Sequence, residues 1–355
     1  MLKLIFTLDY EIHGNGEGNP FDLMVEPTYR LMDILDEYGA KLVIFADIAE
    51  IIKFKEYRDQ FGKDGYSYEK IIYQLRDAVL RGHDVQLHLH SSYFDSYFQS
   101  GKWVQNWAIY NLATLSFEEI DHFIKITKKI LEEEIIKPVK PDYECYIFRA
   151  SNWSMQPTRN IAYALLNNGI CIDSSVYKYG KQTGWVDYDY TDAYNETFPY
   201  KASIEDICQF DPISKLVEFP IHCEMKYLIS FITPIRIFRA IRALRHRHDE
   251  NDQKSNKNKI SACSNGKIYS KFTKLMPSTY PRKFDFNQLT GKQMIKALKK
   301  IKNDADKLNY VTLIGHSKTF IKLNEKSLKE FLNFVDKNRK DYNYALYPKR
   351  YEIFM

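Results

Sequence analysis

The sequence predicts an α/β protein, a distorted barrel of about seven parallel strands with helices outside it. Two observations predict this fold. Short apolar runs that are typical of buried strands alternate with longer stretches in which apolar residues recur at three- and four-residue spacing. Such alternation is typical of parallel strands with helices packed outside them, in an open sheet or a closed barrel, and seven strands favour the barrel.

The elements are predicted in order along the chain. Seven short apolar runs are interpreted as strands, at residues 2–8, 41–46, 84–89, 145–148, 170–172, 216–219 and 310–314. Helical spacing of apolar residues occurs at 28–38, 68–81, 117–136, 158–167 and 290–308. The strands and helices therefore alternate from one end of the sequence to the other.

Residues 1–355 are predicted to form one domain, with an insertion at 226–284 that departs from the alternating pattern. Its first half, Pro234–His248, places arginines three residues apart and apolar residues on another side, which predicts a basic amphipathic helix. The polar second half, residues 249–267, is expected to be a loop. The helix is interpreted either as a solvated face or as a peripheral membrane contact.

Composition excludes several classes of protein. Hydrophobic residues make up 45% and charged residues 27% of the chain, and no apolar run approaches the roughly 20 residues of a membrane span. The five cysteines are scattered without a Cys-x-x-Cys pair, which argues against a disulfide scaffold. A net charge of +5 is too balanced to indicate a nucleic-acid partner. With a first segment that resembles a strand more than a signal peptide, a cytoplasmic location is expected.

Two pairs of ionisable residues follow predicted strands. Asp9 and Glu11 are two residues apart at the end of the first strand, and His88 and His90 have the same spacing at the end of the third. Side chains two apart on a strand point the same way, so each pair can share a site. Nitrogen and carboxylate ligands suit zinc, with iron, nickel or cobalt as alternatives.

Other candidates lie beyond later strands. Arg149 and Trp153 follow the fourth predicted strand, and His316 follows the last one. Because the carboxyl ends of parallel strands share one face of a barrel, these side chains are expected to open on the same mouth as the acids and histidines. His83 precedes its strand and is interpreted as structural.

At this point the residues resemble a known family, the polysaccharide deacetylases of the NodB-homology type, also called carbohydrate esterase family 4. The resemblance covers nearly the whole chain outside the insertion. The segment from Thr7 to Glu11 reads Thr-Leu-Asp-Tyr-Glu and is similar to the family's Thr-Phe-Asp-Asp motif. The family's His-x-x-x-His motif is altered, because Ser92 stands four residues after His88 and His90 takes the place of the second histidine.

The resemblance implies a role for each candidate residue. Asp9 matches the general base, and either Glu11 or Asp9 itself would be the carboxylate ligand of a divalent metal ion. His88 and His90 would be its histidine ligands. The remaining roles are a positioning residue for the base (Arg149), a general acid (His316), substrate-binding residues (Tyr10 and Trp153) and a structural acid (Asp173).

The function implied is hydrolysis of an N-acyl group, acetyl in the first instance, from an amino sugar in a cell-surface glycan or its precursor. The carbohydrate could be linked to a lipid, which the basic helix would suit, and no nucleic-acid partner is expected. Two alternatives remain open at this stage. One is a metal-dependent hydrolase of another small amide or ester, and the other is a glycan-binding protein without catalysis.

Overall fold

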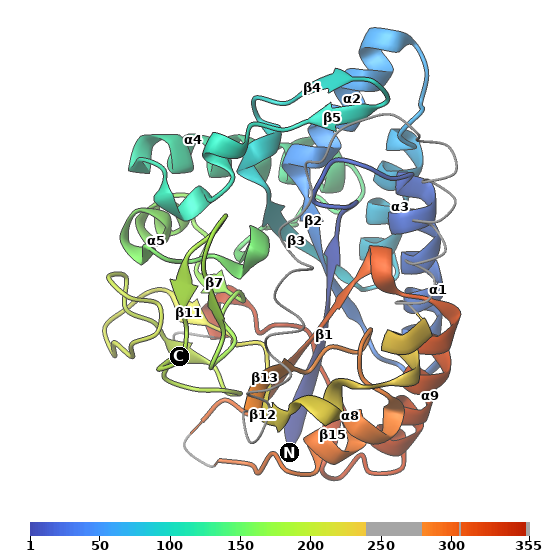
Figure 1. Ribbon diagram of the computed structural model, residues 1–355, viewed down its shortest axis with the longest axis vertical. Helices are drawn as coiled ribbons and strands as arrows, with labels where there is room; N and C mark the ends of the chain where they lie inside the picture. The colour runs from blue at the N-terminus through green and yellow to red at the C-terminus, as the bar shows by residue number, and fades with distance from the viewer. Residues whose placement is uncertain (239–278, 305–306, 353–355) are drawn as a thin grey trace, which may run out of the picture.

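The computed structural model describes residues 1–238, 279–304 and 307–352. A curled, mostly parallel sheet of nine strands forms the centre of this part of the chain (Figure 1). Its strands lie in the order β10-β11-β7-β6-β3-β2-β1-β14, with β15 pairing beside β1. They are β1 (Leu2–Tyr10), β2 (Leu42–Asp47), β3 (Asp84–Leu89), β6 (Ile147–Ala150), β7 (Ile172–Asp173), β10 (Tyr200–Lys201), β11 (Val217–Glu218), β14 (Tyr310–His316) and β15 (Tyr342–Tyr344).

The sheet curls so that its two ends approach each other. Beyond β11, Ile221 pairs in parallel with Thr312 of β14, and the N–H of His222 donates to the carbonyl of Thr312 at 3.1 Å. Ile314, also in β14, exchanges backbone hydrogen bonds with residues 284–286. These contacts complete the distorted (β/α) barrel that the sequence predicts, and all seven predicted strands belong to it.

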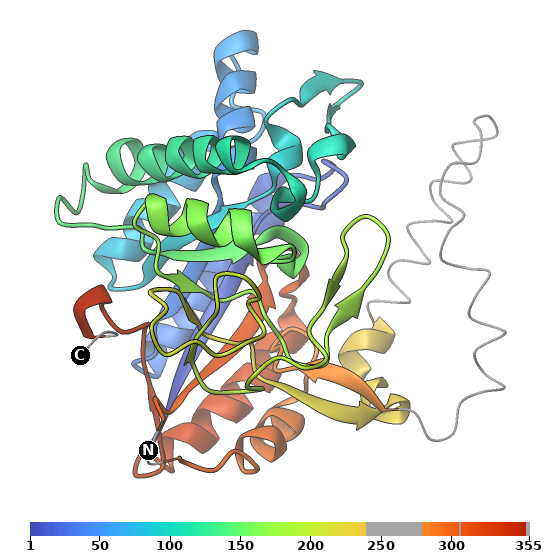
Figure 2. The same cartoon turned by 90° about the vertical axis from the view of Figure 1, so that its left-hand side faces the viewer.

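Helices cover the outside of the sheet, as Figures 1 and 2 show. Four predicted helices are present, and the predicted 290–308 helix is shorter than expected. The helices are α1 (Glu26–Glu37), α2 (Ile48–Phe61), α3 (Tyr68–Leu80), α4 (Phe117–Lys129), which continues as the π-helix η5 (Ile130–Ile136), α5 (Thr158–Asn167), α8 (Gly291–Leu298) and α9 (Lys322–Asp336). The sequence analysis did not predict α2 and α9.

The α8 helix ends early because the chain must turn back into β14. The Asn309 side chain accepts from the N–H of Asp304 at 2.9 Å and donates to its carbonyl at 2.8 Å. These bonds hold the chain before β14 in a turn that a continuing helix would not allow.

Short elements complete the described part of the chain. They are the ribbons β4 (Tyr97–Gln99) with β5 (Lys102–Val104), β8 (Lys181–Gln182) with β9 (Tyr188–Asp189) and β12 (Cys223–Tyr227) with β13 (Thr279–Lys283), together with the short helices η1 (Phe21–Val25), η2 (Ser91–Tyr93), η3 (Trp107–Ile109), η4 (Leu112–Thr114), η6 (Ser151–Trp153), η7 (Leu228–Phe231), η9 (Ser317–Thr319) and η10 (Arg350–Glu352).

Side chains on β1 alternate between two cores. Leu4, Phe6 and Leu8 pack in the larger core between the sheet and the helices. Ile5 belongs to a smaller core on the other face, together with Phe45 and other residues of β2, β6, β7 and β11. Residues two and four positions beyond Ile5 therefore continue on the inner face of the curled sheet, which places the end of β1 at the mouth of the barrel.

The two ends of the predicted insertion lie side by side, because β12 and β13 form an antiparallel ribbon. Residues 234–238 are helical, and Arg236 lies 4.9 Å from the centre of the Phe231 ring and donates to Gln288. The rest of the predicted basic helix and loop lies outside the described residues. The membrane contact of Pro234–His248 stays a prediction.

No helix in residues 1–238, 279–304 and 307–352 is long and apolar enough to cross a membrane. The four cysteines within these ranges are all buried, and each is a free thiol. Cys263 lies outside them. The expected cytoplasmic location stays a prediction.

Candidate active site

The candidate residues meet at one level of the barrel because of the register between neighbouring strands. Asp9 of β1 pairs with His316 of β14, and Asp47 of β2 pairs with His88 of β3. His88 in turn pairs with Arg149 of β6. Since these strands are parallel, the pairings bring the carboxyl ends of five strands and their ionisable side chains to one mouth. The sequence predicts this placement for all of these residues except Asp47.

One half of the site is an ion pair between Asp9 and Arg149. Asp9 Oδ1 accepts from Arg149 Nη1 at 2.8 Å, and Asp9 Oδ2 lies 3.3 Å from His316 Nε2. The guanidinium is completely buried and also donates to the hydroxyl of Thr7 and to the carbonyl and hydroxyl of Ser174. This network holds the carboxylate in one orientation, and the catalytic positioning role expected for Arg149 stays a prediction.

The charge state of Asp9 follows from its neighbours. Burial by itself would raise the pKa of this carboxyl, but the positive charge of Arg149 and the imidazoles of His316 and His88 lower the pKa below its ordinary value. Asp9 is therefore ionised at neutral pH. An ionised carboxylate that is oriented and partly desolvated can accept a proton from a water molecule.

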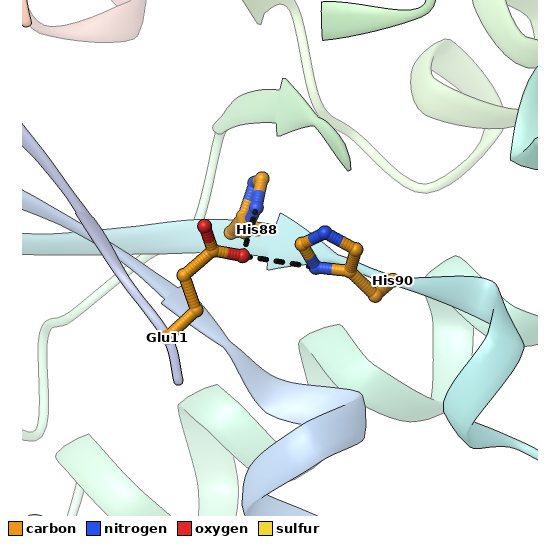
Figure 3. A group of neighbouring side chains, drawn as sticks. All are labelled: Glu11, His88 and His90. Carbon is orange, nitrogen blue, oxygen red and sulfur yellow. Dashed lines mark ion pairs between the residues drawn. The ribbon is translucent and has the colours of Figure 1, made fainter. Parts of the chain in front are cut away.

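The other half of the site contains Glu11, His88 and His90, all of them buried (Figure 3). Glu11 Oε2 lies 3.5 Å from His88 Nε2 and 3.3 Å from His90 Nδ1. One ligand atom from each side chain can be chosen so that all lie within 4.8 Å of one another. Asp9 is not part of this group, so the geometry favours Glu11 as the carboxylate ligand.

Both histidines are oriented by a second hydrogen bond. His88 Nδ1 lies 2.8 Å from the carbonyl oxygen of Arg149, so it carries the proton and leaves the lone pair on Nε2, which faces Glu11. His90 Nδ1, the nitrogen that also faces Glu11, lies 2.7 Å from Asp47 Oδ2. In the carboxylate–imidazole pairs that are typical of metal sites the other ring nitrogen binds the metal, which for His90 is Nε2. Burial would lower the pKa of His90, but the carboxylates of Glu11 and Asp47 raise it.

Lys318, two residues beyond His316, belongs to the candidate site and was not predicted from the sequence. Its Nζ donates to Glu11 Oε1 at 2.6 Å and to the carbonyl of Ile12 at 2.9 Å. Burial by itself would raise the pKa of Glu11, but Lys318 and the two histidines hold the pKa well below its ordinary value. The ammonium thus occupies one oxygen of Glu11 and leaves Oε2 directed at the histidines.

Asp47 and Glu50 form an acidic layer behind the histidines that was also missed. Asp47 accepts from the backbone N–H of Glu50 at 3.3 Å, which caps α2. Glu50 accepts from Ile12 N–H at 3.1 Å and from the Tyr93 hydroxyl at 2.9 Å. Burial and the charge of Asp47 raise the pKa of Glu50 well above its ordinary value. The position of Asp47 at the end of a predicted strand could have identified it.

Trp153 lies at the mouth, and Tyr10 does not. The Trp153 ring is partly exposed and meets the His316 ring edge-on, with 5.8 Å between the centroids. Tyr10 is completely buried in the helix-side core and donates to Gln74 Oε1 at 2.8 Å. The prediction of a substrate contact for Tyr10 is therefore wrong, because residue 10 points to the opposite face of β1 from Asp9.

Both residues that the sequence analysis interpreted as structural, His83 and Asp173, are buried. His83 Nδ1 accepts from the N–H of Leu42 at 3.0 Å. Asp173 accepts from the N–H and the hydroxyl of Ser175 at 3.1 and 2.8 Å. His83 thus fixes the backbone of the neighbouring strand β2, and Asp173 fixes the residues that directly follow its own strand, β7.

The side chains present fit a divalent metal ion. Two imidazoles and one carboxylate are a donor set that zinc and several other transition metals bind at open catalytic sites. All three side chains are buried and oriented by other groups, and Glu11 is ionised. The lone pair of His88 Nε2 and Oε2 of Glu11 are directed at each other, which a cation between them would stabilise.

No known protein-family model matches the chain. No curated protein matches it in sequence.

Solved structures do match the fold. The 4-α-glucanotransferase of Thermococcus litoralis is 14% identical at a TM-score of 0.52, over 99% of this chain, which spans 40% of that protein. A protein of Parabacteroides distasonis, provisionally described as a glycoside hydrolase or deacetylase, is 11% identical at a TM-score of 0.51, over 96% of this chain and 68% of that one. At these identities the likeness establishes the fold alone, a distorted (β/α) barrel.

Proposed function

We propose that this protein is a metal-dependent hydrolase that removes an N-acyl group, acetyl in the first instance, from an amino sugar of a glycan or its precursor. It would belong to a divergent branch of the polysaccharide deacetylases of carbohydrate esterase family 4. The observation that carries the proposal is the pairing of two adjacent units at one barrel mouth. One unit is the Glu11–His88–His90 cluster, and the other is the Arg149–Asp9–His316 chain.

The cluster would hold the metal ion, with Glu11, His88 and His90 as ligands. A bound divalent cation supplies Lewis-acid polarisation of the acyl carbonyl and acidifies water at this mouth. Lys318 would keep Glu11 ionised and oriented, and Asp47 would orient the imidazole of His90 through a hydrogen bond.

The Arg149–Asp9–His316 group supplies the proton transfers. Asp9 would accept a proton from the attacking water, and His316 would donate a proton to the departing sugar amine. A C–O bond forms to the acyl carbon, the C–N bond breaks, and the products are a carboxylic acid and an amine. The 3.3 Å between Asp9 Oδ2 and His316 Nε2 allows the proton to pass from the base to the acid, so that both regain their starting states.

Aromatic side chains around the mouth support a carbohydrate substrate. Trp153 lies beside His316, and its loop is joined to Tyr110, whose hydroxyl donates to Asn152 Oδ1 at 3.0 Å. Tyr110 contacts the rings of Trp107 and Trp185, which are 41% and 69% exposed. Exposed, adjacent indole rings are flat apolar surfaces of the kind that binds ligands, and the apolar faces of sugar rings match them.

The test is release of acetate by the purified, metal-loaded protein from N-acetylglucosamine oligosaccharides, compared with small N-acetyl amides and acetyl esters. We expect turnover of the oligosaccharides in preference to the small substrates. Turnover of small amides or esters alone would retain the hydrolase and change its substrate class. Metal binding without turnover of any of these would contradict the proposed activity and favour the glycan-binding alternative.

A further inference from the structure

Lys283, the last residue of β13, extends into the wall of the candidate active site. Its Nζ lies 3.0 Å from the centre of the Trp153 ring and 4.4 Å from the centre of the Tyr177 ring. Trp153 also meets Tyr177 and His316 edge-on, at centroid distances of 5.7 and 5.8 Å. One indole ring is thus shared between the ammonium of Lys283 and the proposed general acid.

The ammonium of Lys283 differs from the other cations of the mouth. Lys318 is paired with Glu11 at 2.6 Å, and Arg149 is paired with Asp9 at 2.8 Å. Within the part of the chain that the structure describes, no carboxylate oxygen lies within 4.0 Å of Lys283 Nζ. The acid closest in sequence, Asp285, uses its two oxygens for the N–H of Asn287 and the side chain of Gln288.

An ammonium group at the position of Lys283 Nζ is unfavourable when no anionic group pairs with it. The side chain is only partly exposed, and burial lowers the pKa of Lys283 to about 8, although the charge of Asp285 opposes this change. An ammonium is strongly hydrated, and the faces of two aromatic rings replace only part of that hydration. An uncharged side chain of similar length would pack on Trp153 at a smaller desolvation cost.

We propose that Lys283 is a substrate-binding residue that receives an anionic group, a carboxylate or a phosphate, carried by the sugar substrate. Its place on the same indole ring as His316 puts that anion beside the residue to be deacylated. The preferred substrate is then an acidic glycan or a sugar phosphate. This inference rests on the proposed function and narrows its substrate class.

The test measures equilibrium binding by the full-length, metal-loaded protein, independently of turnover. The first pair of probes is a neutral tetrasaccharide of N-acetylglucosamine and a tetrasaccharide of alternating glucuronic acid and N-acetylglucosamine. The second pair is N-acetylglucosamine and its 6-phosphate. We expect the charged member of at least one pair to bind more tightly, and added salt to reduce the difference. The pair that shows the difference identifies the anion as carboxylate or phosphate.

Substitution then assigns the preference to this side chain. Lys283→Met keeps the aliphatic contact with Trp153 and should weaken binding of the charged probe by about 10- to 100-fold, as expected for loss of a hydrogen bond to a charged group. Binding of the neutral probe should be unchanged. Lys283→Arg retains the charge and should retain most of the preference, and a thermal melt of each variant checks that it is folded.

Lys178→Met is the matched control. Lys178 also lies near an aromatic ring, at 5.6 Å from the centre of Tyr179, but its Nζ has a carboxylate partner, Glu196, at 3.9 Å. Its substitution should leave both affinities unchanged.

Three outcomes would overturn the inference. They are equal affinity for charged and neutral probes, unchanged charged-probe binding in Lys283→Met, and no binding of any probe. Release of acetate from neutral and charged oligosaccharides alike would leave the proposed function intact and remove the inference. Charge-selective binding that depends on Lys283, without acetate release, would retain the inference and contradict the hydrolase activity.

Discussion

The two ends of strand β3 each have histidine residues, and the two ends use them differently. At the amino end, buried His83 accepts from the N–H of Leu42, and its Nε2 lies 3.4 Å from Asp36 Oδ1. At the carboxyl end, His88 and His90 direct ring nitrogens at Glu11 and take their orientation from the Arg149 carbonyl and from Asp47.

The two ends of β3 differ in the groups that each imidazole contacts. His83 serves the backbone of a neighbouring strand, so burial lowers its pKa to about 4 and the ring stays neutral. His90 faces carboxylates that raise its pKa, which is the environment of a cation site. In a parallel barrel, ionisable residues at the amino ends of strands serve stability, and those at the carboxyl ends gather where a ligand can reach them.

The substitution with the largest expected effect removes the histidines at the carboxyl end of β3. The double substitution His88→Ala, His90→Ala removes both nitrogen ligands, so near-stoichiometric metal in the wild-type protein should be lost together with all activity. Elemental analysis after dialysis against each metal in turn measures this. His122→Ala, at an exposed position on α4, is the control and should bind metal normally. Full metal content in the double variant would contradict the proposed ligands.

The next effect separates catalysis from metal binding. His316→Ala should keep its metal and lose about 10²- to 10⁴-fold in kcat, the usual contribution of a positioned acid or base. Parallel measurement of kcat and metal content checks this. Unchanged turnover would exclude His316 as the general acid.

A third substitution tests the buried ion pair at the same mouth. Arg149→Met leaves the Asp9 carboxylate buried without its partner and should lower the free energy of unfolding by about 3–5 kcal/mol. The exposed pair Arg159–Glu205 provides the control, since Arg159→Met should cost only about 0–1 kcal/mol. Urea denaturation of both variants at pH 7 makes the comparison.

The same pair has a defined pH dependence. The folded protein lowers the pKa of Asp9, so its contribution to stability is present above the pKa of the unfolded chain and is lost as pH falls through the folded value. The difference between wild type and Arg149→Met should therefore shrink on acidification. A difference that grows at low pH would contradict this interpretation.

The substitution with the smallest expected effect replaces His83 at the amino end of β3. His83 is neutral when folded and becomes protonated near pH 6.5 when unfolded, so it destabilises the fold as pH falls from 6.5 towards 4. Between pH 7 and pH 5 this amounts to about 2 kcal/mol. His83→Gln should be less stable at pH 7 but less sensitive to acid over that interval, as urea titrations at both pH values would show. An unchanged acid sensitivity would mean that His83 is already protonated in the fold.

Much of the barrel and of the site could be predicted from local pattern. Short apolar runs predict all seven strands, and a parallel arrangement of these strands predicts Asp9, His88 and His316 at one mouth. Because side chains on a strand alternate between its two faces, neighbouring residues Asp9 and Tyr10 of β1 point in opposite directions. The substrate contact predicted for Tyr10 does not take this alternation into account.

The helix α2 was missed for a physical reason. Its first two turns bury residues around much of the helix, Glu50 and Lys53 among them, so no apolar stripe of helical period stands out. Glu50 was missed with it, because a buried acid in the middle of an unrecognised helix has no signal in the sequence alone.

The sequence by itself determined the order of strands and helices, and with it which residues stand at the carboxyl ends of the strands. Only the tertiary structure decided which of them touch. Whether Glu11 or Asp9 joins the histidines depends on the pairing of Lys318 with Glu11 and of Arg149 with Asp9. Residue 283 reaches Trp153 only through the β12–β13 ribbon. These contacts join residues more than a hundred positions apart, and periodicity records only near neighbours along the chain.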